Sequence, residues 1–202
     1  CPSCRSNTNK DFKETTKKYD AVRRCLNEDF KCKKIAVESL KHFVSKEALN
    51  IEGFGKKIVE QFWELKLIKF PQDIFSLNFD KIKNLEGWGN LSVANLKYAI
   101  GKSKKINLDR FIYSLGIRHI GQENAKLLAQ HLKNIDNFCK LSRINEIENL
   151  SNIDGIGETQ IKSIKNFFSN EINISILKKL TENMKISNSP TDKKDGILKN
   201  KT

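Results

Sequence analysis

The chain has 202 residues and a formal net charge of +13 at pH 7, with 37 Lys and Arg against 24 Asp and Glu. The basic residues are spread along the chain, which favours a polyanionic partner; a lysine-rich surface that only aids solubility is the alternative. No stretch approaches the roughly 20 apolar residues of a membrane span, so we expect no integral membrane protein. The first residue is Cys1 rather than a methionine, so we expect a fragment or a processed product.

Four cysteines form two close pairs at the start of the chain. They are Cys1, Cys4, Cys25 and Cys32, in the arrangement C-x2-C-x20-C-x6-C. Two such pairs match the tetrahedral four-thiolate set of structural zinc, which leaves no open position for a catalytic water. Disulfide bonds are the alternative, but the sequence shows no signal peptide and a fifth cysteine, Cys139, is left over. We predict a small zinc finger over residues 1–34 and a core thiol at Cys139.

Residues 35–186 carry apolar residues at helical spacing, interrupted by a repeated turn pattern. The pattern apolar, acidic, Gly, apolar, Gly occurs three times, and a fourth copy has His119 in place of the first glycine. The copies occupy residues 51–55, 85–89, 117–121 and 153–157. Their last glycines are 34, 32 and 36 residues apart, and such a period marks a repeated supersecondary unit. We therefore predict a mainly α fold in which four helix–turn–helix units follow the zinc finger.

The paired glycines indicate phosphate binding. Glycine tolerates the positive φ and close backbone approach that a tight turn between helices needs. The first amides of the following helix have no partner within it and lie at the positive end of its dipole, where phosphate binds well. Ordinary helix C-caps are the alternative, but four copies at regular spacing in a basic chain favour phosphate. The expected contact residues are Gly53, Gly55, Lys56, Lys57, Gly87, Gly89, Asn90, Arg118, His119, Gly121, Gln122, Gly155 and Gly157.

The four copies resemble the helix-hairpin-helix motif, a reader of the DNA backbone without sequence specificity. Its signature, h-x-h-G-h-G-x-x-x-A, has a small or apolar residue four positions after the last glycine. Val59, Val93, Ala125 and Ile161 hold that position here. The copies are not equal, because Lys56 and Lys57 follow the first, whereas Glu158 follows the fourth and competes with phosphate. We expect the fourth to be the weakest DNA contact.

Residues 1–186 resemble the zinc finger and helix-hairpin-helix domains of bacterial NAD-dependent DNA ligases. The most specific stretches are residues 38–46, ESLKHFVSK, and residues 115–121, LGIRHIG, the latter preceded by RFIY at residues 110–113. The order of cysteine module, linking segment and four turns also matches. Residues 187–202 are polar and contain a Ser-Pro step, so we expect a linker toward a missing C-terminal domain.

This resemblance implies a function. In the family, the four cysteines bind structural zinc and the turns grip the minor-groove side of nicked double-stranded DNA. The parent enzyme seals nicks during replication and repair with NAD and magnesium, in catalytic domains that this chain does not contain. The resemblance thus implies an inactive fragment without catalytic residues, whose partners are nicked DNA and its own catalytic domains. A monomer in the bacterial cytoplasm, at the nucleoid, is expected.

Residues 193–196 spell K-x-D-G, the family's adenylated-lysine motif, but they lie in a polar tail with no pocket to shift a lysine pKa, so we interpret the match as chance. His42 is expected to cap or to pack between modules rather than to act in catalysis.

A free-standing helix-hairpin-helix repair or junction module is an alternative function, although such arrays usually lack an adjacent four-cysteine finger. A protein-interaction scaffold is less favoured, because the glycines are intact and the chain is basic.

Overall fold

The computed structural model describes residues 1–13, 16–27 and 30–188, which fold mainly into helices. The N-terminal strands are β1 (Thr8–Asn9), β2 (Phe12–Lys13), β3 (Lys18–Tyr19) and β4 (Arg24–Cys25). The next elements are α1 (Lys33–Val44), α2 (Lys56–Glu64), η1 (Pro71–Ser76), α3 (Phe79–Lys83), α4 (Asn90–Ser103), β5 (Lys105–Asn107) and α5 (Leu108–Ser114). The last are α6 (Gln122–Leu132), α7 (Ile135–Lys140), α8 (Ile144–Glu148), η2 (Asn149–Asn152), α9 (Glu158–Phe168), α10 (Glu171–Asn183) and β6 (Lys185–Ser187).

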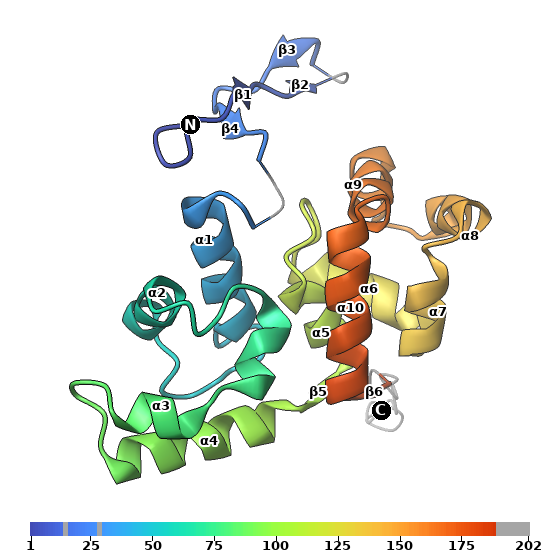
Figure 1. Cartoon of the computed structure of the whole chain (residues 1–202). Helices are drawn as coiled ribbons and strands as arrows, with labels where there is room; N and C mark the ends of the chain where they lie inside the picture. Colours follow the sequence, from blue (N-terminus) through green and yellow to red (C-terminus); the bar gives the residue numbers. More distant parts are fainter. Residues whose placement is uncertain (14–15, 28–29, 189–202) are drawn as a thin grey trace, which may run out of the picture.

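The N-terminal strands form a narrow two-stranded ribbon that lies beyond the start of α1, outside the helical body (Figure 1). β1 pairs with β4 and β2 with β3, both antiparallel. Phe12 and Tyr19 are cross-strand partners whose ring centroids are 5.2 Å apart, yet both side chains are exposed. A ribbon with so little buried apolar surface is marginal by itself, so a further stabilising interaction is needed at its base.

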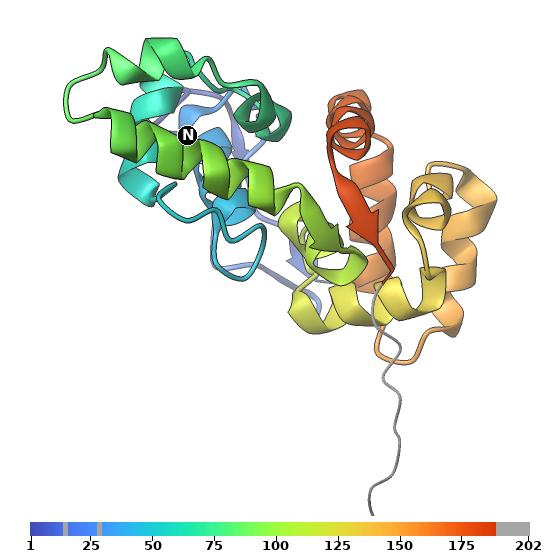
Figure 2. The same cartoon turned by 90° about the horizontal axis from the view of Figure 1, so that it is seen from below.

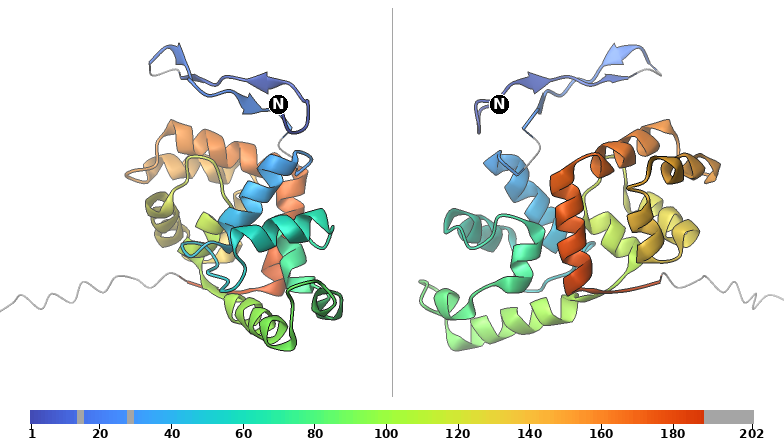
Figure 3. Two further views of the ribbon diagram at one scale, coloured as in Figure 1. Left: turned by 90° about the vertical axis from the view of Figure 1, so that its left-hand side faces the viewer. Right: turned by 45° about the vertical axis from the view of Figure 1, so that its right-hand side comes forward.

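The helical body has two sides that share one hydrophobic core. α2, α3 and α4 lie on one side and α6 to α9 on the other (Figures 1 and 2). Between them, α5 packs against α1 and α6, and α10 packs against η1 and α9 (Figure 3). The fully buried aromatic residues come from both sides: Phe43, Phe62, Phe111 and Phe138. Helices as short as these are marginal in water alone, so this shared core holds them.

A short parallel pair, β5 with β6, joins the end of α4 to the end of α10. Ile106 lies opposite Ile186, and the Ser187 hydroxyl donates to Asn107 Oδ1 at 2.8 Å. Ser187, which we expected to open the polar linker, thus belongs to a strand. The pair joins segments about 80 residues apart, so local periodicity does not indicate it. Residues 189–202, with the rest of that linker and the K-x-D-G sequence, lie outside the described part of the chain.

Within the described residues, no helix is both long and apolar enough to cross a membrane.

Candidate nucleic-acid interface and metal centre

The four glycine patterns form turns of one local geometry. We name them the first to fourth turns, residues 51–55, 85–89, 117–121 and 153–157. The third residue of each has a positive φ: Gly53 +77°, Gly87 +82°, His119 +62° and Gly155 +88°. In each turn the fourth residue donates its amide to the carbonyl of the first, at 3.0–3.1 Å. Positive φ at the third residue is the mark of a type II turn and explains the glycines, while histidine is among the residues that tolerate this conformation.

The last glycine of each turn is the N-cap of the next helix. These residues are Gly55 before α2, Gly89 before α4, Gly121 before α6 and Gly157 before α9. At the first three, no side chain caps the helix, so its first amides face outward without an internal acceptor. At the fourth, Gln160 Oε1 accepts a hydrogen bond from the Gly157 amide at 3.2 Å. The first three turns therefore offer the better anion sites.

The structure leaves every residue that we predicted to contact phosphate exposed. The first residues of the helices after the turns differ in charge: Lys56, Asn90, Gln122 and Glu158. A lysine extends the positive end of the α2 dipole, whereas Glu158 is favourable for α9 itself but repels an anion. The charges therefore agree with the capping in making the fourth turn the poorest anion site.

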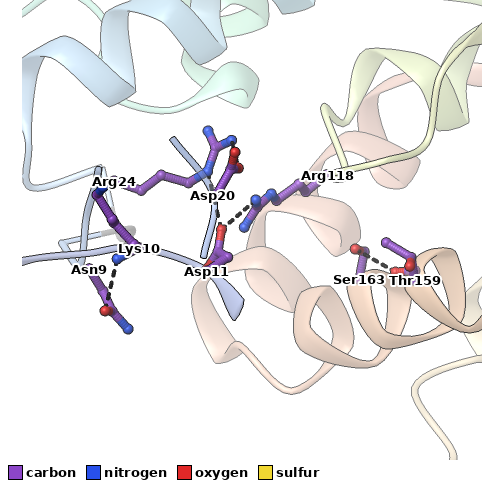
Figure 4. Close-up of polar contacts among 8 residues, drawn as sticks. All are labelled: Asn9, Lys10, Asp11, Asp20, Arg24, Arg118, Thr159 and Ser163. Carbon is purple, nitrogen blue, oxygen red and sulfur yellow. Dashed lines mark hydrogen bonds and ion pairs between the residues drawn. The ribbon is translucent and has the colours of Figure 1, made fainter. Parts of the chain in front are cut away.

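Arg118 of the third turn is held by the N-terminal ribbon. Its Nη2 lies 2.5 Å from Asp11 Oδ2, and the same oxygen accepts a hydrogen bond from Arg24 Nε at 3.2 Å (Figure 4). The Arg118 guanidinium, and secondarily Arg24, lower the pKa of the Asp11 carboxyl from its ordinary value. Asp11 is not among the predicted site residues, because no local pattern pairs residues so far apart in the chain.

The four N-terminal cysteines converge at the base of the ribbon. Cys25 ends β4, Cys32 is the N-cap of α1, and all four Sγ atoms lie within 4.8 Å of one another. Cys1 Sγ is 3.8 Å from Cys32 Sγ, and Cys4 Sγ is 3.4 Å from Cys25 Sγ. Four sulfurs around a tetrahedral zinc at 2.3 Å would be roughly 3.8 Å apart. All four cysteines are free thiols, so this set could hold a metal ion, as zinc requires.

The surroundings of the set shift the pKa values of Cys4 and Cys25 in opposite directions. Hydrogen bonds from the side chain and backbone of Ser6 lower the pKa of Cys4 to about 6. At Cys25 the Asn27 amide lowers the pKa, but burial and the neighbouring Cys4 outweigh it, so the pKa is raised. Cys139 lies apart on α7, where burial raises its pKa and favours the inert thiol.

Two side chains join the first unit to the third. His42 Nε2 on α1 lies 2.7 Å from the carbonyl oxygen of Tyr113 on α5. Arg110, also on α5, donates to the Lys46 carbonyl at 2.5 Å and to the Ala48 carbonyl at 3.0 Å. His42 therefore packs between helical units, and Arg110 holds the segment that leads into the first turn. Both contacts restrict how the first and third turns can move relative to each other.

Comparisons with known proteins agree with this geometry. The family described as "Helix-hairpin-helix motif" matches residues 110–177, which contain the third and fourth turns. The chain is 63% identical over 202 residues to a DNA ligase of Pelagibacter ubique (strain HTCC1062), covering 100% of the chain and 30% of that protein. It is 42% identical over 205 residues to a DNA ligase of Wolbachia pipientis subsp. Culex pipiens, with the same coverage. The chain is related to DNA ligases.

The relationship predicted from the cysteines and turns is thus confirmed. A DNA ligase of Parvibaculum lavamentivorans is also similar, at 41% identity over 194 residues, which cover 90% of this chain and 27% of that protein. The chain thus spans about 30% of the length of the curated relatives that it matches. The similarity runs through both the cysteine module and the helical body.

Proposed function

We propose that this chain is the non-catalytic DNA-binding portion of an NAD-dependent DNA ligase, and that it holds nicked duplex DNA without reading its sequence. One observation carries the proposal: four turns repeat the same backbone geometry, and three of them present uncapped helix amides. In this proposal all four turns are helix-hairpin-helix motifs. Backbone amides bind the phosphate group, which is the same at every nucleotide, so the contact carries no sequence information.

Charge supports a nucleic-acid partner. Lys56 and Lys57 follow the first turn and are exposed, and the whole chain has an excess of 13 positive charges. Cations beside a phosphate site release counterions from DNA on binding, which makes the affinity depend strongly on salt. The shared core and the His42 and Arg110 contacts hold the turns in a set arrangement, so several phosphates can be bound without ordering a loose chain.

We assign a structural zinc ion to Cys1, Cys4, Cys25 and Cys32. Four thiolates complete the tetrahedron, so the metal would supply folding free energy to the ribbon rather than chemistry. Because Cys32 is the N-cap of α1, the metal would also fasten the ribbon to the first helix of the body.

For the parent protein we propose the sealing of nicks during DNA replication and repair, in the bacterial cytoplasm at the nucleoid. We assign the lysine that becomes adenylated, and the sites for NAD and magnesium, to parts of the parent outside this chain. The chain alone is then an inactive monomer that binds DNA and cooperates with the parent's catalytic domains.

The test is equilibrium binding of labelled nicked and intact duplexes of equal sequence across a salt series. We expect micromolar or tighter affinity with little dependence on sequence. In a plot of log K against log salt concentration, the slope should be roughly −0.9 for each phosphate that the protein neutralises. A preference for the nicked duplex supports the ligase assignment, whereas equal affinity favours a general DNA module. If zinc-loaded, folded protein binds neither duplex, the proposed function is wrong for this chain alone.

A further inference from the structure

We propose that Asp11 competes with DNA phosphate for Arg118, so that the ribbon lowers the DNA affinity of the third turn. This inference rests on the proposed function, since it concerns how tightly that turn binds DNA. It assigns to the cysteine module a second effect beyond its structural one: it sets affinity through one carboxylate.

The carboxylate lies where an anion would bind. Arg118 adjoins His119 and is three residues before Gly121, the N-cap of α6, at which no side chain caps the helix. Its Nη2 is 2.5 Å from Asp11 Oδ2, and both side chains are partly exposed, at 42% and 41%. In Figure 4 the Arg118 side chain points toward Asp11 and away from Thr159 and Ser163 of α9. A phosphate that reaches the α6 amides would therefore meet Arg118 already engaged.

The ribbon holds Asp11 in place independently of Arg118. The Asp20 amide donates to the Asp11 carbonyl at 2.7 Å, which continues the β2–β3 pairing. Arg24 Nε binds the Asp11 carboxylate at 3.2 Å, while Arg24 Nη2 lies 3.2 Å from Asp20 Oδ2 (Figure 4). Two aspartates and two arginines thus alternate at this corner. Their charges sum to zero, and Asp11 offsets the one arginine that belongs to a turn.

The competition is physically direct. Carboxylate and phosphate oxygens make the same charge-assisted hydrogen bonds with a guanidinium, so one group replaces the other at little cost in geometry. An exposed ion pair is weak, and water replaces it readily, so phosphate can displace Asp11. Breaking the pair still subtracts from the binding free energy, and the displaced carboxylate then stays near the DNA backbone and repels it. Both effects have the same sign: Asp11 weakens binding.

The experiment measures duplex DNA affinity of the zinc-loaded chain at low salt for Asp11→Asn and its matched control, Asp20→Asn. Both variants remove one negative charge from the same ribbon, but Asp20 pairs with Arg24 whereas Asp11 contacts Arg118. We expect Asp11→Asn to bind about two- to fivefold more tightly than Asp20→Asn, the range set by one exposed ion pair. Asp11→Ser is the second variant and should agree, which separates loss of the carboxylate from any property of asparagine.

The same two substitutions are then made in an Arg118→Ala background, where Asp11→Asn and Asp20→Asn should bind DNA with equal affinities. Equal affinities in the wild-type background, or weaker binding by Asp11→Asn and Asp11→Ser, would overturn this inference while leaving the proposed function intact. The second of these outcomes would show that Asp11 orients Arg118 for DNA instead of competing with it. Absence of DNA binding by the wild-type chain would overturn the proposed function itself, and this inference with it.

Discussion

The imidazole ring of His42 lies against Gly116, so that a Cβ atom at residue 116 would be 3.4 Å from His42 Cδ2. The same ring packs edge-on against Tyr113, with ring centroids 4.6 Å apart. Because His42 is on α1 and Gly116 follows α5, this contact joins the first helix–turn–helix unit to the third. Gly116 also has a φ of +66°, so both its backbone and its neighbour favour glycine.

Gly116→Ala should therefore lower the free energy of unfolding by about 1–2 kcal/mol, because alanine at positive φ is strained and its methyl group presses on His42. The matched control is Gly101→Ala near the end of α4, where a Cβ meets no atom within 4 Å and φ is not positive. That change should stabilise the protein by about 0.5–1 kcal/mol. Urea unfolding followed by circular dichroism measures both. Equal effects of the two substitutions would contradict both the backbone strain at Gly116 and its contact with His42.

Loss of the cysteine set should unfold the ribbon without unfolding the helices. Cys25→Ser removes one of four ligands, so we expect zinc to fall from one ion per chain to well below one. The hydrophobic core begins at Val37 and is built by the helices, so ellipticity at 222 nm should change little. Cys139→Ser, which removes the thiol on α7, should keep one zinc per chain. Zinc is measured by atomic emission; a wild-type chain without zinc would contradict the metal assignment.

The backbone of the turns could be predicted from the sequence because it is local. Four residues decide each turn, and a glycine at the third position favours a positive φ whatever surrounds it. Even the exception could be recognised, since His119 occupies the same position as Gly53 and adopts the same sign of φ. The convergence of the cysteines was predictable for a similar reason, as two close pairs have few ways to surround one ion.

The contacts between distant segments could not be predicted in this way. β5 meets β6, and Asp11 meets Arg118, only because the whole body has folded. Neither contact produces a periodic pattern or a compositional bias in the sequence. Gln160 is intermediate: a glutamine at the third position of a helix is a recognisable capping residue, but its effect on Gly157 becomes clear only from the 3.2 Å hydrogen bond.

An ion pair across the first unit should make stability depend on pH. Lys41 Nζ on α1 lies 2.6 Å from Glu60 Oε1 on α2, and this lysine lowers the pKa of the Glu60 carboxyl from its ordinary value of 4.5. A lowered folded-state pKa stabilises the protein above the ordinary value, and the effect is lost as pH falls through the folded value. Glu60→Gln should thus be less stable than wild type near pH 7, and this difference in stability should disappear as the pH falls below about 4.5.

Glu47→Gln is the control for that pair, because it makes the same change of charge at an exposed residue outside α1 and α2. Thermal unfolding midpoints from pH 3 to pH 8 would measure both variants. The Glu60 side chain is half exposed, at 50%, so the effect should be small and should shrink further in high salt. A gap that persists unchanged at pH 3 would mean that Glu60 stabilises the unit by packing rather than by charge.

The turns should differ in their contribution to DNA binding, and the fourth should matter least. Gly89→Val places a branched side chain over the uncapped amides of α4 at a position where φ is −104° and a Cβ meets no atom within 4 Å. The fold should therefore persist while DNA affinity falls by roughly tenfold, the loss of one charge-assisted phosphate contact. Gly157→Val makes the same change where Gln160 already occupies the amide and Glu158 repels phosphate, so its affinity should change less than twofold.

Gln160→Ala tests the reason for that difference, because it frees the Gly157 amide without altering charge or the turn. If capping limits the fourth turn, this variant should bind DNA slightly more tightly than wild type, and Gly157→Val should then cost more in its background. Titration of one labelled duplex against all four variants at fixed salt measures the series. Equal losses for Gly89→Val and Gly157→Val would show that the fourth turn contacts DNA as closely as the second, despite its glutamate and its cap.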